Sequence, residues 1–190
     1  MAHGFNKVRP EGSGKTVAVI GDSTFLHSGV TGLMNIAYNR SVSTVLILDN
    51  SITGMTGHQQ NPATGRTLQM EEVPPVDLEK LCQAVGIRRV RAVDPSDLKA
   101  LETALKEELA ADEPSVIICR RPCMLLKHVK PKPALTVDAE KCRGCKSCMR
   151  IGCPAIRFTE GKAVIDRAQC VGCGLCAQLC AFGAIGEVEK

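Results

Sequence analysis

The sequence predicts an α/β domain, in which helices cover a parallel sheet, followed by a small cysteine-rich α+β domain. Between residues 16 and 120, apolar runs alternate with helical patterns, an order typical of parallel sheets covered on both faces. Eight cysteines crowd into the stretch from Cys142 to Cys180. Because a Pro- and Lys-rich stretch separates the two regions, we expect one domain at residues 1–130 and another at 134–190.

The first half of the α/β domain has two strands and one helix by its local pattern. TVAVIGD, from Thr16 to Asp22, is an apolar run that predicts a buried strand. A helix is expected from Ser28 to Arg40. Its apolar face would contain Val30, Leu33, Met34 and Ala37. STVLILDN, from Ser43 to Asn50, predicts a second buried strand.

The second half continues the alternation after a long polar loop. SITGMTGHQQNPATGRT has the length and composition of a functional loop. DLEKLCQAVG predicts a helix, VRAVD a strand and PSVIICR a final strand. We expect Asp94 to cap the helix between these strands, with Pro95 at its first position. Leucines follow at helical spacing, at positions 98, 101, 105 and 109.

The C-terminal region is an internal repeat that aligns Cys142 with Cys170, and Glu160 and Gly161 between the copies predict a hairpin turn. Each copy carries C-x2-C-x2-C and a later cysteine. With two residues between successive cysteines, a tight turn can aim three sulfurs at one iron–sulfur cubane, and the fourth ligand comes from the other copy. We therefore expect a ferredoxin-like domain with two 4Fe-4S clusters. The ligands would be Cys142, Cys145, Cys148 and Cys180 for one cluster, and Cys170, Cys173, Cys176 and Cys153 for the other.

Zinc knuckles are the alternative for these cysteines, but they use two C-x2-C pairs instead of two runs of three plus one. Two features depart from the common ferredoxin pattern. Four residues separate Cys148 from Cys153, and Ala181 follows Cys180 where proline is usual. We expect the insertion to alter the local loop and to leave the number of ligands intact.

Composition argues against a nucleic-acid or membrane role. Two oxidised clusters, each about −2 with its thiolates, would cancel the formal net charge of +4, and no basic stripe with aromatic residues appears. The sequence has neither an apolar run of about 18 residues nor a signal-peptide pattern. Eleven cysteines without such a signal favour metal ligands in the reducing cytoplasm.

Polar residues end the first two predicted strands. Asp22, between Gly21 and Ser23, closes the first strand, and Asn50 closes the second. Because the carboxyl ends of adjacent parallel strands converge, a carboxylate and an amide oxygen would meet there, which suits Mg²⁺ bound to a diphosphate. Gly21 would let the backbone approach the phosphates. Asn50 could equally be only a turn former.

Three segments carry a family resemblance: GDSTFLHSGVTGLMNIAYN, LILDNSITGMTGHQQNPATGRT and VDPSDLKALETALKEELAADEPSVIICRRPC. They resemble the C-terminal part of the alpha subunit of indolepyruvate ferredoxin oxidoreductases, and the ferredoxin tail follows in the same order. The resemblance implies a thiamine diphosphate-binding domain with Mg²⁺, oxidative decarboxylation of an aryl 2-oxo acid, acyl capture by coenzyme A, electron delivery to external ferredoxin, and anaerobic metabolism.

Site residues also follow from the resemblance. Asp22 and Asn50 would be the side-chain ligands of Mg²⁺, and the carbonyl of Ile52 a third ligand. The diphosphate would be lined by Gly21, Ser23 and Thr53. No catalytic residue is assigned: His27 and His58 lie near the family's active centre, but they could equally order a helix start and a loop.

The family's activating glutamate belongs to a pyrimidine-binding domain that precedes the part matched here. We therefore expect activity to require a partner chain or a further region, with this chain a fragment, a split subunit or a vestigial module. The alternative function is an electron-transfer module whose α/β domain only docks a partner or binds a nucleotide.

Three further sequence patterns have simpler interpretations than a functional site. EGSGKT fails as a phosphate-binding loop because its first glycine would fall at Arg9 and because it precedes a strand. Cys119 and Cys123 could form a redox pair, but buried or incidental cysteines are the simpler interpretation. Cys82 is expected in the core.

Overall fold

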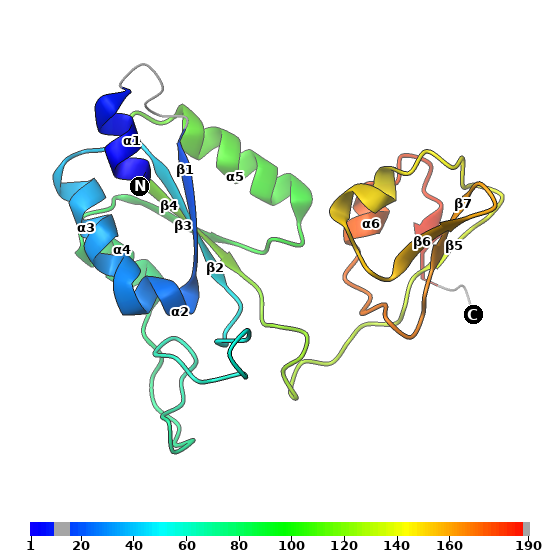
Figure 1. The fold of residues 1–190 in the computed structure, drawn as a ribbon, viewed down its shortest axis with the longest axis horizontal. Coiled ribbons are helices and arrows are strands. Elements are labelled where there is room, and N and C mark those ends of the chain that lie inside the picture. The colour runs from blue at the N-terminus through cyan, green and yellow to red at the C-terminus, as the bar shows by residue number, and fades with distance from the viewer. Residues whose placement is uncertain (10–15, 188–190) are drawn as a thin grey trace. The chain divides into compact units, whose positions relative to one another are not determined.

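The computed structural model describes residues 1–9 and 16–187 (Figure 1). EGSGKT lies almost entirely outside these residues. The chain divides into two compact units, Met1–Cys123 and Met124–Lys190. Within the described residues, no helix has both the length and the apolar character needed to cross a membrane.

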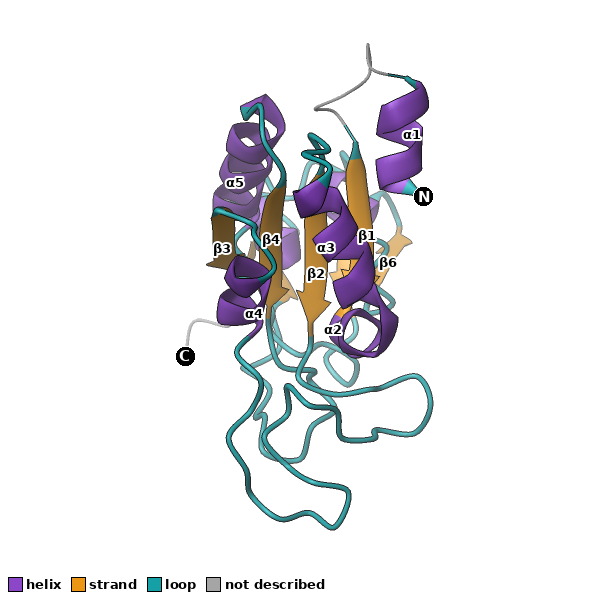
Figure 2. Ribbon diagram, turned by 90° about the vertical axis from the view of Figure 1, so that its left-hand side faces the viewer, coloured by secondary structure: helices purple, strands orange, loops and turns teal. Residues whose placement is uncertain are grey.

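A four-stranded parallel sheet forms the centre of the first unit (Figure 2). The strands are β1 (Val17–Gly21), β2 (Thr44–Asp49), β3 (Arg89–Val93) and β4 (Ser115–Arg120), in the order β1-β2-β4-β3. Every neighbouring pair is parallel, which confirms the predicted sheet. All carboxyl ends therefore meet at one edge, and the long loop of residues 50–77 extends beyond it (Figures 1 and 2).

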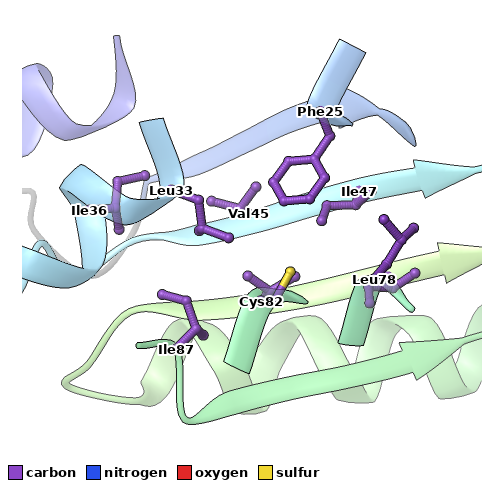
Figure 3. Close-up of a cluster of buried hydrophobic side chains, with 10 residues drawn as sticks. Phe25, Leu33, Ile36, Val45, Ile47, Leu78, Cys82 and Ile87 are labelled. Atoms are coloured by element: carbon purple, nitrogen blue, oxygen red, sulfur yellow. The ribbon is translucent and has the colours of Figure 1, made fainter. Parts of the chain in front are cut away.

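Helices cover both faces of this sheet. α3 (Val30–Tyr38) and α4 (Leu78–Ala84) lie on one face, and α5 (Leu98–Ala110) lies on the other (Figures 1 and 2). The larger core cluster lies under α3 and α4, and Figure 3 shows its members Leu33, beside Val45 of β2, and Cys82, over β4. Each fully buried Leu, Ile or Phe in such a core stabilises the fold by about 1.5–3 kcal/mol.

The helical segment after β1 begins earlier than predicted. α2 (Asp22–Thr24) and a π-helical turn (Phe25–Gly29) lead without a break into α3, so the segment begins at Asp22 and not at Ser28. The predicted apolar face is wrong at Met34, which is 51% exposed, whereas Ile36 is buried. Each residue turns a helix by about 100°, so Met34 points away from the face that Leu33 and Ile36 share.

The predicted cap of α5 is wrong by three residues. Asp97 caps the helix, because its side chain accepts a hydrogen bond from the Ala100 N–H at 2.9 Å. Asp94 instead accepts from the Ser96 N–H at 2.8 Å, in the turn before the helix. Two capping residues stand close together in Asp-Pro-Ser-Asp, and the later one is used. A short helix that the sequence did not predict, α1 (Ala2–Val8), precedes β1.

The second unit consists of two antiparallel strand pairs and two short helices. β5 (Thr136–Val137) pairs with β8 (Ile185–Gly186), and β6 (Ile156–Thr159) pairs with β7 (Lys162–Ile165). Glu160 and Gly161 form the predicted hairpin turn, both with positive φ. The helices are a 3-10 turn (Ser147–Ile151) and α6 (Leu175–Gln178), so each repeat contributes one helix next to its cysteines. The 3-10 turn includes three of the four residues between Cys148 and Cys153.

Candidate functional site

The predicted Mg²⁺ ligands lie at the carboxyl edge of the sheet. Asp22 directly follows β1, and Asn50 directly follows β2. Gly21, the last residue of β1, pairs with Leu48 near the end of β2. Neighbouring parallel strands thus bring Asp22 and Asn50 to the same edge, as the sequence pattern predicts.

Asp22 is a buried carboxylate at the end of β1. Its side chain is 3% exposed, and Oδ2 accepts a hydrogen bond from Asn61 Nδ2 at 3.2 Å. Burial raises the pKa of Asp22, and the charge of Asp49 adds to the rise, while the Ser23 N–H and the Asn61 amide oppose it. In the described part of the chain, no lysine or arginine pairs with Asp22. A cation bound there would therefore stabilise the carboxylate.

Asn61 connects the long loop to the strand end. Its Nδ2 also lies 3.4 Å from Thr53 Oγ1, and its Oδ1 accepts a hydrogen bond from the Ala63 N–H at 2.9 Å. The side chain is 5% exposed. Sequence reasoning missed this residue, because Asn61 stands before Pro62 in a polar loop and such a pair usually marks only a turn.

Two consecutive Asx turns, in which a side-chain oxygen accepts a hydrogen bond from the N–H two residues further on, shape the segment after β2. Asp49 Oδ1 accepts a hydrogen bond from the Ser51 N–H, and Asn50 Oδ1 accepts one from the Ile52 N–H, both at 3.1 Å. Ser51 adopts a positive φ of 59° between them. The Asn50 side chain is exposed and Ile52 is buried. The amide oxygen of Asn50 is thus held beside the backbone of Ile52.

The end of β4 anchors the same segment. Arg120 Nε lies 2.8 Å from Asp49 Oδ2, and the same guanidinium reaches Glu79 at 3.1 Å. The Cys123 N–H donates to the Asn50 carbonyl and the Arg121 N–H to the Asp49 carbonyl, both at 2.9 Å. The backbone that carries Asn50 is therefore fixed from two sides.

The two candidate histidines are not part of this network. His27 is exposed in the π-helical turn, and His58 is exposed in the long loop with a φ of 63°. The residues predicted to line the diphosphate lie at the carboxyl edge of the sheet or in the loop beyond it. Gly21 and Ser23 flank Asp22, and Thr53 contacts Asn61. A Cβ added at Gly21 would meet no atom within 4 Å, so the space beside its backbone is open.

The eight cysteines of the second unit surround two cavities. The first cavity is lined by Cys142, Cys145, Cys148 and Cys180, and the second by Cys153, Cys170, Cys173 and Cys176. Each cavity combines three cysteines of one repeat with the fourth of the other, which is the grouping that crossed ligation requires.

The thiols within each cavity influence one another. Burial raises the pKa of Cys148, and the neighbouring Cys145, Cys180 and Cys142 add to the rise. No three His, Cys, Asp or Glu side chains in residues 1–9 and 16–187 form a group suited to a single metal ion. The cysteines instead stand around a shared space.

Comparison with known proteins agrees with both units. Residues 1–119 match the family of thiamine pyrophosphate enzymes in their C-terminal TPP-binding domain, and residues 134–181 match the 4Fe-4S dicluster domain. Indolepyruvate oxidoreductase subunit IorA of Pyrococcus horikoshii is 41% identical over 183 residues, which cover 92% of this chain and 28% of the relative. The same subunit of Methanothermobacter thermautotrophicus is 36% identical over 177 residues, with coverage of 93% and 29%.

A solved structure has a similar fold. The 2-oxoglutarate:ferredoxin oxidoreductase from Magnetococcus marinus superposes with a TM-score of 0.56 at 18% identity, over 67% of this chain and 45% of that chain. The chain spans less than a third of the length of the two curated relatives. The resemblance to indolepyruvate oxidoreductase alpha subunits is confirmed over nearly the whole chain. The chain therefore belongs to the family of thiamine pyrophosphate enzymes, and in this chain the C-terminal TPP-binding domain of that family is followed by a 4Fe-4S dicluster domain.

Proposed function

We propose that the chain is the cofactor-binding and electron-transfer part of a 2-oxoacid ferredoxin oxidoreductase that acts on aryl pyruvates, with indolepyruvate as substrate. The acyl group passes to coenzyme A and the electrons to external ferredoxin. One observation carries the proposal: a single chain joins a TPP-binding domain, with a buried carboxylate at its sheet edge, to eight cysteines around two cavities. The relatives' name, indolepyruvate oxidoreductase, supports the substrate class.

Mg²⁺ and the diphosphate bind at the carboxyl edge of the sheet in this proposal. The Asp22 carboxylate, the Asn50 amide oxygen and the Ile52 carbonyl hold Mg²⁺, since Mg²⁺ prefers oxygen ligands. The site fits a cation because Asp22 is buried and no lysine or arginine of residues 1–9 and 16–187 pairs with it. Gly21, Ser23 and Thr53 line the diphosphate, and the open space beside Gly21 leaves room for it.

Thiamine diphosphate, when bound, supplies the electron sink for removal of carbon dioxide from the 2-oxo acid. The chain's own residues position that cofactor and carry electrons away. Cys142, Cys145, Cys148 and Cys180 would hold one 4Fe-4S cluster, and Cys153, Cys170, Cys173 and Cys176 would hold the other. Two such clusters would supply one-electron acceptors for the two electrons released per 2-oxo acid.

We place the TPP-binding domain at residues 1–130 and the cluster domain at residues 134–190. A partner chain or further region carries the pyrimidine-binding domain with its activating carboxylate. We expect the protein to act in the cytoplasm, where cysteine thiolates stay reduced.

Calorimetric titration of the full chain tests cofactor binding. Thiamine diphosphate should bind in the presence of Mg²⁺, and Asp22→Ala should weaken binding at least about tenfold, since the removed ligand is charged. Asp112→Ala is the matched control, because Asp112 is exposed after α5. If the unaltered chain does not bind the cofactor even with its partner, the thiamine assignment is wrong and an electron-transfer module remains.

Two further measurements test the rest of the proposal. Anaerobically purified protein should contain about eight irons and eight sulfides per chain, the content of two 4Fe-4S clusters. The complex isolated from its native source should reduce ferredoxin with aryl pyruvates only when coenzyme A is present. Equal rates without coenzyme A would exclude the acyl-transfer half of the reaction.

A further inference from the structure

We propose that the two clusters differ in reduction potential, and that the cluster of the first cavity has the more positive one because basic side chains surround it. This inference rests on the proposed function, which assigns a 4Fe-4S cluster to each cavity. The first three ligands of each copy have the same cysteine spacing, so this spacing does not account for such a difference. The difference lies in the walls of the two cavities.

Basic side chains stand around the first cavity. Arg143 and Lys146 line it directly. The Lys146 ammonium lies 4.5 Å from the ring centroid of Phe158, another lining residue, and this contact holds the charge close to the cavity. Lys162 Nζ donates a hydrogen bond to the Cys142 carbonyl at 2.6 Å. Reduction adds one negative charge to a cluster, so nearby cations stabilise the reduced state more than the oxidised state.

Carboxylates near the first cavity do not cancel these charges. Asp138 pairs with Lys141 at 3.3 Å, so that pair is neutral as a unit. Glu140 and Glu160 are exposed, as are Arg143 and Lys146, but only the two basic residues line the cavity. None of these acidic side chains lines the cavity.

Hydrogen bonds to sulfur act in the same direction. The Ala184 N–H donates to Cys180 Sγ at 3.3 Å. The backbone N–H groups of Ala163 and Gly144 also donate to Cys142. Donors of this kind withdraw negative charge from a thiolate and raise the potential of the cluster that it ligates.

The second cavity has an apolar wall. Leu135, Ile151, Ile156, Ile165 and Val171 line it, and no charged side chain in the described part of the chain does so. An apolar wall disfavours the negative charge that reduction adds to a cluster. The first electron to enter the domain should therefore reside on the cluster of the first cavity.

A redox titration of the full chain, reconstituted anaerobically and followed by EPR, tests the inference. We expect two one-electron steps. Lys162→Gln and Lys146→Gln should each move the more positive step to lower potential and leave the other in place, while Lys162→Arg should restore the original value. Lys127→Gln is the control, because Lys127 is exposed and lines neither cavity. It should move neither step.

The possible failures can be distinguished. Coincident steps in a protein with about eight irons would overturn the inference and leave the cluster assignment intact. A shift of the more negative step in both lysine variants, or of neither step, would also overturn it. An iron content near four in the unaltered chain would instead contradict the assignment of two clusters under the proposed function.

Discussion

Asn61 Nδ2 donates a hydrogen bond to Asp22 Oδ2 across 3.2 Å, although 39 positions separate the two residues in the sequence. The same amide contacts Thr53 at 3.4 Å. Asn61 therefore joins the end of β1 to two points of the long loop. Asn61 orients the Asp22 carboxylate, which we assign to Mg²⁺. A change that disturbs the conformation of the long loop should therefore also weaken the metal site.

Asn61→Ala should weaken the binding of Mg²⁺ and thiamine diphosphate by about tenfold or more. A hydrogen bond to a charged group contributes about 1.5–3 kcal/mol, and 1.4 kcal/mol corresponds to a factor of ten. Calorimetric titration of the full chain measures the change. Asn39→Ala is the control, since Asn39 is exposed after α3 and bonds only to Asn35 through its side chain. An unchanged dissociation constant in Asn61→Ala would show that Asp22 needs no support from the loop.

The contrast between Asp22 and Asn61 shows what the sequence can predict at this site. Asp22 follows an apolar strand directly, and the rule that parallel strands share a carboxyl edge places it beside Asn50. Asn61 lies in a loop without periodicity, and its partner is distant in the chain. Only the folded path of that loop brings Asp22 and Asn61 together, so local sequence patterns do not predict this contact.

Other differences between prediction and structure have similarly local causes. Asp94 and Asp97 are both good helix caps, and propensity alone does not choose between them. Met34 and Ile36 are both apolar, and the packing of α3 against the sheet decides which one is buried. The cysteine pattern was more informative, because ligand number and spacing follow from the geometry of a cubane.

Gly144→Ala should impair cluster assembly far more than Gly152→Ala. Both glycines have a left-handed φ, 67° at Gly144 and 65° at Gly152, so each alanine carries a backbone cost of about 1–2 kcal/mol. A Cβ at Gly144 would also collide with the carbonyl oxygen of Gly161, whereas one at Gly152 would meet no atom within 4 Å. Iron content and thermal unfolding of the two variants measure the difference. Equal losses would mean that the hairpin turn moves aside freely.

Glu108→Gln should lower the free energy of unfolding by about 2 kcal/mol, because hydrogen bonds between charged groups are lost in a buried site. Glu108 is 2% exposed in its side chain and lies 2.7 Å from Arg89 Nε and 2.9 Å from Arg91 Nε. Glu107→Gln is the matched control, since Glu107 also pairs with Arg91 but is 51% exposed. Its change should stay below about 1 kcal/mol. Chemical denaturation would contradict the expectation if the two variants lost equal stability.

The three cysteines outside the cluster domain should differ sharply in reactivity. Cys82 is 0% exposed, and burial raises its pKa to about 12, with a further rise from the charge of Glu79. At pH 8 its thiolate fraction is therefore roughly one in ten thousand. Cys119 is also buried, and burial raises its pKa as well. Cys123 is only half-buried, so a small alkylating agent should modify it first in the folded protein.

The raised pKa of Cys82 makes the stability of the folded protein depend on pH. Because the folded state holds Cys82 as a neutral thiol, its contribution to stability is fully present below the ordinary thiol pKa of about 8.5 and falls as pH rises towards 12. Native protein should therefore label at Cys82 more slowly than at Cys123 at pH 8, and this difference should shrink as alkaline conditions favour thiolate formation and unfolding. Peptide mapping after timed alkylation measures both rates. Modification of Cys82 as fast as Cys123 at pH 8 would mean that α4 opens readily, contrary to its place in the core.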